Sequence, residues 1–222
     1  MVFVFDFDGT LHDTARLYGQ AVRSALAALP SDFSPRRSCT DEALSRYLGM
    51  TAQQMWEDFI PELPESLRLQ AMDEVARQMN EGIRAGQARL YEGIPALLSR
   101  LKEAGHTLLI LSNCYTSYMD AHRAFFSLDR WFSGYYCSQA YGDIPKEDIF
   151  LQIRSDFPGN HVMIGDRASD IRVGLVRGIP TIACGYGFGT SEEYQGADWI
   201  VNSVRELEER LLRCSESRKS PG

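Results

Sequence analysis

The chain has 222 residues, enough for one sizeable core and a smaller module, because most domains hold about 100 to 150 residues. Hydrophobic residues make up 44% and charged residues 24%, which is ordinary for a globular protein and excludes wholesale disorder or a fibrous structure. The formal net charge of −7 argues against a nucleic-acid partner, since such a protein needs a basic surface.

The chain begins with a short apolar run that leads into two aspartates, MVFVFDFDGTLHDT. Residues 2–5 do not alternate in polarity, which is typical of a strand buried on both faces of a parallel sheet. Asp6 would end this strand, and Asp8 would follow on the same side because side chains alternate. Gly9 allows close backbone approach to a ligand, and Thr10 offers an amide and a hydroxyl to an anion. The pattern indicates metal-assisted attack on phosphate, although aspartates also commonly end strands and begin turns.

Four helical patterns without a convincing strand follow in residues 15–87. Thr14 can cap the first helix and Thr40 the second. Thr51 and Gln54 have the capping-box spacing of a third helix, and a longer helix completes the stretch. We therefore expect residues 15–87 to form a separate helical module.

From Tyr91 onward, short apolar runs alternate with helical patterns, which predicts a parallel sheet with right-handed crossovers. The predicted strands are residues 107–111, 135–137, 161–164 and 181–184. Ligands bind at the carboxyl ends of such strands. The residues that follow these ends are therefore the candidates for a functional site.

Polar residues stand at three of these positions, and each has an ordinary explanation as well as a functional one. Ser112 and Asn113 could hold a phosphate oxygen or could simply cap a helix. Lys146 could contact a ligand or be a solvated surface charge. Asp166 and Asp170 lie four residues apart near the start of a helix, where carboxylates are common in any case.

Taken in order, these motifs resemble those of the haloacid dehalogenase superfamily. The matching stretches are DFDGTLHDT, Ser112, Lys146 and GDRASD with Asp166 and Asp170. The chain departs from the pattern at the third motif, where relatives often read KP and this chain has PKE. The helical module after the first motif and the segment GYGFGTSEEYQGADWIVNSVREL resemble the helical-cap subfamily of phosphoglycolate phosphatases and β-phosphoglucomutases.

The resemblance implies an α/β fold, a Rossmann-like doubly wound parallel sheet with strand order 3-2-1-4-5 and an inserted helical cap. The predicted division of the chain has three parts. They are a core domain of residues 1–14 and 88–214, a helical cap of residues 15–87, and a loose tail of residues 215–222.

Converging carboxylates require a cation, because two of them about 4 Å apart repel by about 4 kcal/mol at an effective dielectric constant of 20. Oxygen-only ligands and a phosphate substrate favour Mg²⁺. By resemblance, the metal binds the Asp6 carboxylate, the Asp8 backbone carbonyl and Asp166, with Asp170 bound directly or through water.

The resemblance also implies a mechanism. Asp6 attacks phosphorus to form an aspartyl phosphate, while Asp8 protonates the leaving alcohol and then activates water. Ser112, Lys146 and Mg²⁺ neutralise the phosphate oxygens. The expected phosphate-binding residues are Gly9, Thr10, Ser112, Asn113 and Lys146.

The expected function is Mg²⁺-dependent hydrolysis of a small phosphomonoester, such as a phosphoglycolate-like ester, a sugar phosphate or a nucleotide. Asp8 favours a phosphatase over the dehalogenases of the superfamily, which have no acid there, and over the P-type pumps, which have a lysine. Two alternatives stay open. One is a phosphomutase of the β-phosphoglucomutase type, and the other is a non-catalytic binding protein on the same fold.

Further expectations concern the surroundings of the site and of the protein. His12 should face solvent, and the loop from Gly49 to Thr51 is a candidate selectivity element. The five cysteines contain no CxxC pair, and the N-terminus does not resemble a signal peptide. No stretch approaches the roughly 20 apolar residues of a membrane helix. We expect a cytoplasmic monomer or homodimer that binds a small phosphorylated metabolite and no membrane.

Overall fold

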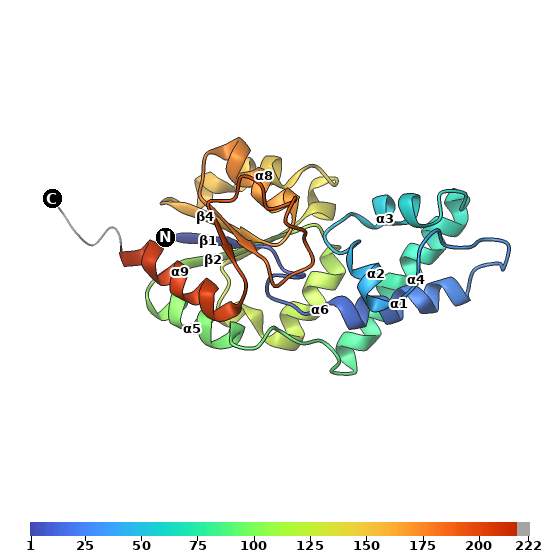
Figure 1. Ribbon diagram of the computed structural model, residues 1–222. Helices are drawn as coiled ribbons and strands as arrows, with labels where there is room; N and C mark the ends of the chain where they lie inside the picture. The colour runs from blue at the N-terminus through green and yellow to red at the C-terminus, as the bar shows by residue number, and fades with distance from the viewer. Residues whose placement is uncertain (217–222) are drawn as a thin grey trace.

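The computed structural model describes residues 1–216, and within them six parallel strands form one sheet (Figure 1). They are β1 (Val2–Phe5), β2 (Thr107–Ser112), β3 (Gly134–Cys137), β4 (His161–Gly165), β5 (Thr181–Cys184) and β6 (Trp199–Val201). Their spatial order is β3-β2-β1-β4-β5-β6, and all neighbours are parallel. The predicted doubly wound sheet and the order 3-2-1-4-5 are confirmed. The edge strand β6 was not among the predicted strands.

Both faces of the sheet are covered by helices, which explains why β1 lacks alternation. Phe3 and Phe5 pack in an apolar cluster with α5, α6 and α9, and Val2 and Val4 pack on the other face with α7 and α8. Figure 1 shows α8 on one side of the strands, with α5 and α9 on the other. The helices are α5 (Ile94–Glu103), α6 (Thr116–Phe126), α7 (Lys146–Ile153), α8 (Ala168–Arg177) and α9 (Val204–Glu216).

The expected helical module consists of four helices that lie beyond one end of the sheet (Figure 1). They are α1 (Ala15–Ala27), α2 (Asp41–Ser45), α3 (Ala52–Phe59) and α4 (Glu65–Arg84). They share an apolar cluster that includes Tyr47, Trp56 and Phe59. Leu17 and Met79 of the same helices pack instead with the core of the sheet. The module therefore has a core of its own and an apolar contact with the sheet.

Two of the three predicted helix caps of the module are present. The Thr40 hydroxyl accepts a hydrogen bond from the Ala43 amide at 3.2 Å, and Thr51 with Gln54 forms a reciprocal capping box. Thr14, in contrast, makes no side-chain cap for α1. The expectation for Thr14 was wrong because its hydroxyl is hydrogen-bonded to a carboxylate of the site described below.

Short 3₁₀ turns supplement the helices at Leu128–Arg130, Ser138–Tyr141 and Arg154–Asp156, the last of which directly follows α7. Helix α9 continues through Ser215 and Glu216, where a loose tail was expected, and the rest of that tail lies outside the described residues. Within residues 1–216, no helix is both long enough and apolar enough to cross a membrane.

Candidate active site

Asp6 and Lys146 form a buried ion pair at the carboxyl end of the sheet. Asp6 directly follows β1, and its Oδ1 accepts a hydrogen bond from Lys146 Nζ at 2.8 Å. Lys146 also donates to Asp170 Oδ1 at 2.7 Å, so one ammonium bridges two carboxylates. Burial opposes the charge of this lysine, but Asp170 and Asp6 together raise its pKa above the ordinary value. The predicted third-motif lysine is thus not a surface residue.

The two oxygens of the Asp6 carboxyl group have different surroundings. Oδ1 is bound to Lys146, whereas Oδ2 is buried and has no hydrogen-bond partner among the described residues. Burial raises the pKa of Asp6 to about 7, and Lys146 opposes this rise. Oδ2 is therefore a buried acceptor without a protein donor, and such atoms are rare unless a water, an ion or a ligand binds them.

Asp166 and Asp170 lie beside Asp6 at the end of β4 and the start of α8. Asp166 accepts a hydrogen bond from the Thr10 hydroxyl at 3.2 Å and from the Phe188 amide at 2.7 Å. Asp170 accepts from the Arg167 amide at 3.0 Å, which anchors it in the first turn of α8. Burial raises the pKa of Asp166 well above its ordinary value, and the neighbouring carboxylates add to the rise.

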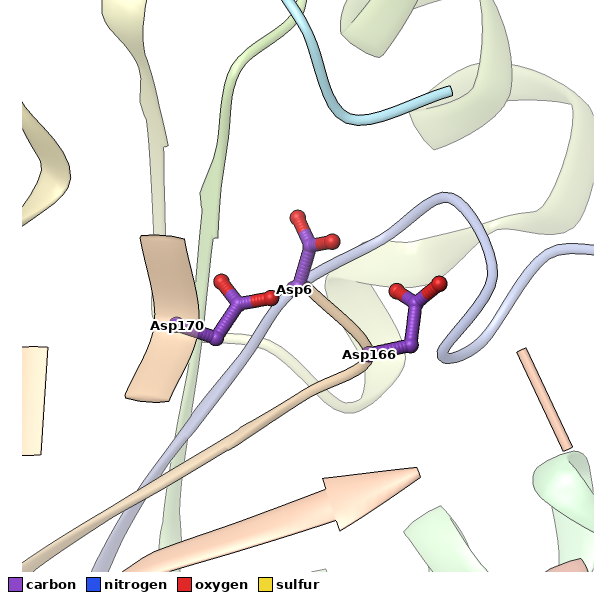
Figure 2. A group of neighbouring side chains, drawn as sticks. All are labelled: Asp6, Asp166 and Asp170. Atoms are coloured by element: carbon purple, nitrogen blue, oxygen red, sulfur yellow. The ribbon is translucent and has the colours of Figure 1, made fainter. Parts of the chain in front are cut away.

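One oxygen from each of Asp6, Asp166 and Asp170 lies within 4.8 Å of the others. Figure 2 shows that the three carboxylates come from different elements and point to the same side. The hard oxygen donors of these three carboxylates fit a small divalent cation such as Mg²⁺. The donor set thus suits the metal expected from the sequence, and Lys146 supplies positive charge to the same cluster.

Asp8 is not part of this carboxylate cluster. Its Oδ1 accepts three hydrogen bonds, from Thr14 Oγ1 at 2.5 Å, Tyr118 Oη at 2.7 Å and His12 Nδ1 at 3.1 Å. Burial opposes ionisation of Asp8, but the hydrogen bond and charge of His12, with help from His122 and Thr14, hold its pKa below the ordinary value. Because all three donors bind Oδ1, Oδ2 is the oxygen that can exchange a proton with a ligand.

His12 is fully buried, so the expectation that it faces solvent was wrong. Its ring lies against Phe7 with centroids 5.3 Å apart, and against His122 with centroids 4.4 Å apart. Burial lowers the pKa of His122 to about 3, and His12 adds to this shift. Neither His122 nor Tyr118 was singled out from the sequence, because nothing in the local pattern of α6 distinguishes them from core residues.

Gly9 and Thr10 make the turn after Asp8, and their backbone amides are hydrogen-bonded within the loop. The Gly9 amide donates to the His12 carbonyl at 2.9 Å, and the Thr10 amide to the Phe7 carbonyl at 3.4 Å. Gly9 has φ +80°, and a Cβ there would collide with the Asp166 carboxylate. In this structure the two residues shape the loop and hold Asp166. Their predicted binding of phosphate stays a prediction.

Ser112 and Asn113 lie at the end of β2, as the sequence predicted. Ser112 is the last residue of the strand, is buried and lines the cavity described next. The Asn113 side chain donates to the Gly49 carbonyl at 3.1 Å, so it contacts the helical module. The structure therefore brings Ser112 to the cavity and gives Asn113 a partner that the sequence did not indicate.

A cavity of about 410 Å³ lies between the carboxyl end of the sheet and the helical module. On the sheet side it is lined by Asp6, Asp8, Ser112 and Asn113. The opposite wall comes from α3, α4 and the loop before α3, including Gly49, Met50 and Thr51 of the predicted selectivity loop. The cavity is thus open to both aspartates of the opening motif.

The comparison with known families agrees with this arrangement. A family model described as haloacid dehalogenase-like hydrolase matches residues 3–184. The chain belongs to this family. The match spans the first motif, the helical module and the strands β1 to β5, and it confirms the expected enzyme class, a hydrolase of the haloacid dehalogenase type.

The relatives of the chain include a 5′-nucleotidase and phosphoglycolate phosphatases by name. The chain is 27% identical to a 5′-nucleotidase of Pseudomonas aeruginosa, with 86% of this chain and 85% of the relative covered. It is 26% identical to a phosphoglycolate phosphatase of Mesorhizobium japonicum, with 96% and 97% covered. The crystal structure of a predicted phosphatase from Clostridium acetobutylicum superposes with a TM-score of 0.81 at 29% identity, covering 96% of this chain and 98% of the other.

Proposed function

We propose that the protein is a Mg²⁺-dependent phosphatase that hydrolyses a small phosphomonoester by way of a phosphoryl group carried on Asp6. The observation that carries the proposal is the position of Asp6. Among the described residues, it alone belongs both to the carboxylate cluster and to the cavity wall. Its unpartnered Oδ2 is a nucleophile in the place where a phosphate ester entering the cavity would meet the cation site. The phosphatases among the relatives support the same reaction.

In the proposed reaction, Asp6 and Asp8 have different roles. When bound by Asp6, Asp166 and Asp170, Mg²⁺ supplies positive charge that offsets the carboxylates and the phosphate oxygens. The Asp6 carboxylate attacks phosphorus as the ester oxygen leaves, and the protonated form of Asp8 gives that oxygen a proton. Because the pKa of Asp8 is lowered, this form is the minor one and takes its proton from solvent before the attack. Asp8 then takes a proton from the water that attacks the phosphoryl group, which releases phosphate and restores Asp6. Lys146 holds the Asp6 carboxylate in place through its Oδ1.

We further propose that the helical module is a cap that closes the reaction site from bulk water. Its support is a set of hydrogen bonds between the core and the loop after α2. The Arg167 guanidinium donates to the carbonyls of Arg46 and Leu48, and Asn113 donates to that of Gly49. These contacts hold the loop over the end of the sheet, where water exclusion strengthens the electrostatic interactions of the site.

Chelation should abolish the activity. We expect hydrolysis of p-nitrophenyl phosphate to stop in EDTA and to return when Mg²⁺ is added in excess. In Asp166→Ala, Mg²⁺ binding should weaken by at least about tenfold because one carboxylate ligand is lost. Isothermal titration calorimetry measures the binding, and circular dichroism should show an unchanged fold. Full activity in excess chelator would contradict the proposal.

The stabilising effect of Mg²⁺ should grow with pH. The pKa of Asp6 is raised to about 7 in the folded protein, against about 3.9 in an unfolded chain, so the metal-free folded state binds more protons across that range. Its free energy of unfolding therefore falls as the pH rises from about 4 to about 7. Mg²⁺ binds the ionised carboxylates and should offset this loss.

Thermal unfolding with and without Mg²⁺ measures this effect, with NaCl of equal ionic strength as the control. We expect Mg²⁺ to raise Tm more at pH 8 than at pH 5. An equal or larger rise at pH 5 would show that the cation binds outside the carboxylate cluster.

A further inference from the structure

The cavity provides much more room than a phosphoryl group needs. Its volume of about 410 Å³ lies in the range of about 300 to 1,000 Å³ that is usual for sites that enclose a whole organic ligand. Asp6, Asp8 and Ser112 line its inner end. If the phosphoryl group meets Asp6, the rest of the cavity must hold the alcohol part of the ester.

The wall around that remaining space combines apolar and aromatic side chains with the uncharged polar side chains of Thr51, Gln53 and Gln54. Trp56 and Met55 of α3, Met79 of α4 and Tyr18 of α1 line it, and Met50 lies at its edge with 36% of its surface exposed. Trp56, Met55 and Met79 are buried, so their positions are set by packing. A polarisable wall of aromatic rings and thioethers suits a flat apolar group.

The same wall provides no positive charge. Within residues 1–216, no lysine, arginine or histidine lines the cavity, and its charged lining residues are the acids Asp6, Asp8 and Asp143. A carboxylate or second phosphate on the alcohol part would lose its hydration without gaining a counter-charge, which is unfavourable. The lining therefore selects against an anionic leaving group.

Three cations lie close to the cavity without lining it: Arg46 has its guanidinium 5.8 Å from the centre of the Tyr47 ring and is exposed, and Lys146 and Arg167 are already engaged. Lys146 is bound between Asp6 and Asp170. Arg167 pairs with Glu193 at 3.0 Å and donates to backbone carbonyls of the loop after α2. Lys146 and Arg167 each satisfy groups of the protein itself, so neither compensates a charge on the alcohol part.

We propose that the substrate is a phosphate monoester of an uncharged alcohol that carries a flat, largely apolar ring, and that esters of hydroxy acids and bisphosphates are poor substrates. This inference rests on the proposed function for the position of the phosphoryl group. It departs from the substrate named for the phosphoglycolate phosphatase relative, because glycolate carries a carboxylate.

A matched pair of esters tests the inference. Benzyl phosphate and its 4-carboxy derivative have the same leaving oxygen and nearly the same size, and they differ by one negative charge. With Mg²⁺ and the wild-type protein, we expect kcat/KM to be at least about tenfold higher for benzyl phosphate, as for a buried group left unpaired. A smaller preference, or a preference for the carboxylated ester, overturns the inference while leaving the proposed phosphatase function intact.

A binding experiment separates failure of this inference from failure of the proposed function. Benzylphosphonate and 4-carboxybenzylphosphonate lack the ester oxygen, and their benzylic carbon is bonded directly to phosphorus, so they cannot be hydrolysed by this route. Calorimetric titration into the wild-type protein with Mg²⁺ should show tighter binding of benzylphosphonate, whether or not the esters are turned over. If neither ester reacts but this order of binding holds, the phosphatase proposal fails and the ligand class stands. The opposite order overturns the ligand class.

Arginine substitutions place a positive charge inside and outside the cavity. Met50→Arg adds a cation at the cavity edge, and Leu69→Arg adds the same charge on α4, where Leu69 is 51% exposed and outside the lining. Met50→Arg should reduce the preference for benzyl phosphate at least fivefold, whereas Leu69→Arg should leave it within twofold of wild type. Equal shifts in both variants would show that net charge, and not the cavity wall, sets the preference, which overturns the inference.

Discussion

Replacing Asp6 by asparagine should abolish turnover, with kcat reduced by roughly four orders of magnitude or more. An amide oxygen is a poor nucleophile, so no phosphoryl group can form on residue 6. The change keeps the shape of the side chain but removes one negative charge from a cluster that also contains Asp166 and Asp170. Hydrolysis of p-nitrophenyl phosphate and mass spectrometry of acid-quenched protein measure the two consequences.

The Asp6→Asn protein should remain folded, and its metal-free Tm should be equal to or above that of wild type. Removal of the Asp6 charge relieves the repulsion that helps to raise the pKa of Asp166. Asp73→Asn, the same chemical change at an exposed position of α4, should leave turnover unchanged. Normal turnover by Asp6→Asn would show that another residue is the nucleophile.

The sheet could be predicted from the sequence because its strands are short, buried runs that end at glycine or polar residues. Phe3 and Phe5 pack on one face and Val2 and Val4 on the other, so the run reads as continuously apolar. The edge strand β6, Trp199–Val201, is also an apolar run followed by a polar residue, Asn202, but it was not among the predicted strands. It lies at the end of the sheet and pairs only with β5 among the described strands.

The carboxylate cluster could be anticipated for a topological reason. Asp6 and Asp166 each directly follow a parallel strand, and β1 and β4 are neighbours in the sheet, so their ends must lie together. Asp170 follows one helical turn later on the same side. Lys146 could be placed only by its motif, because its partners Asp6 and Asp170 are 140 and 24 residues away in the chain.

The surroundings of Asp8 could not be predicted in the same way. Tyr118 reaches Asp8 from α6, 110 residues away, through a single hydroxyl that no periodic pattern encodes. His12 and Thr14 are close in sequence, but the tight turn at Gly9 brings them back to Asp8. Such contacts depend on the packing of α6 against the loop, which is a property of the assembled fold.

Replacing Asp8 by asparagine should slow turnover by about 100- to 10,000-fold, the usual range for loss of a general acid and base. The amide oxygen can still accept hydrogen bonds from Thr14 and Tyr118, so the loop should keep its conformation. The loss should be smallest for p-nitrophenyl phosphate, because p-nitrophenolate leaves without a proton, and larger for alkyl phosphates. A loss of equal size for all leaving groups would contradict the role of Asp8 as proton donor.

The same variant should accumulate a phosphoryl group on Asp6. With an activated ester the first step still proceeds, but the base that activates water for the second step is missing, so the intermediate persists. Mass spectrometry of acid-quenched Asp8→Asn should show the added group on the peptide that contains Asp6.

Tyr118→Phe is the matched control. It removes one donor to Asp8 but keeps the carboxylate, so it should lose no more than about tenfold in kcat and trap no phosphoenzyme. A phosphoryl group on any other residue would overturn the assignment of Asp6 as nucleophile and of Asp8 as acid and base.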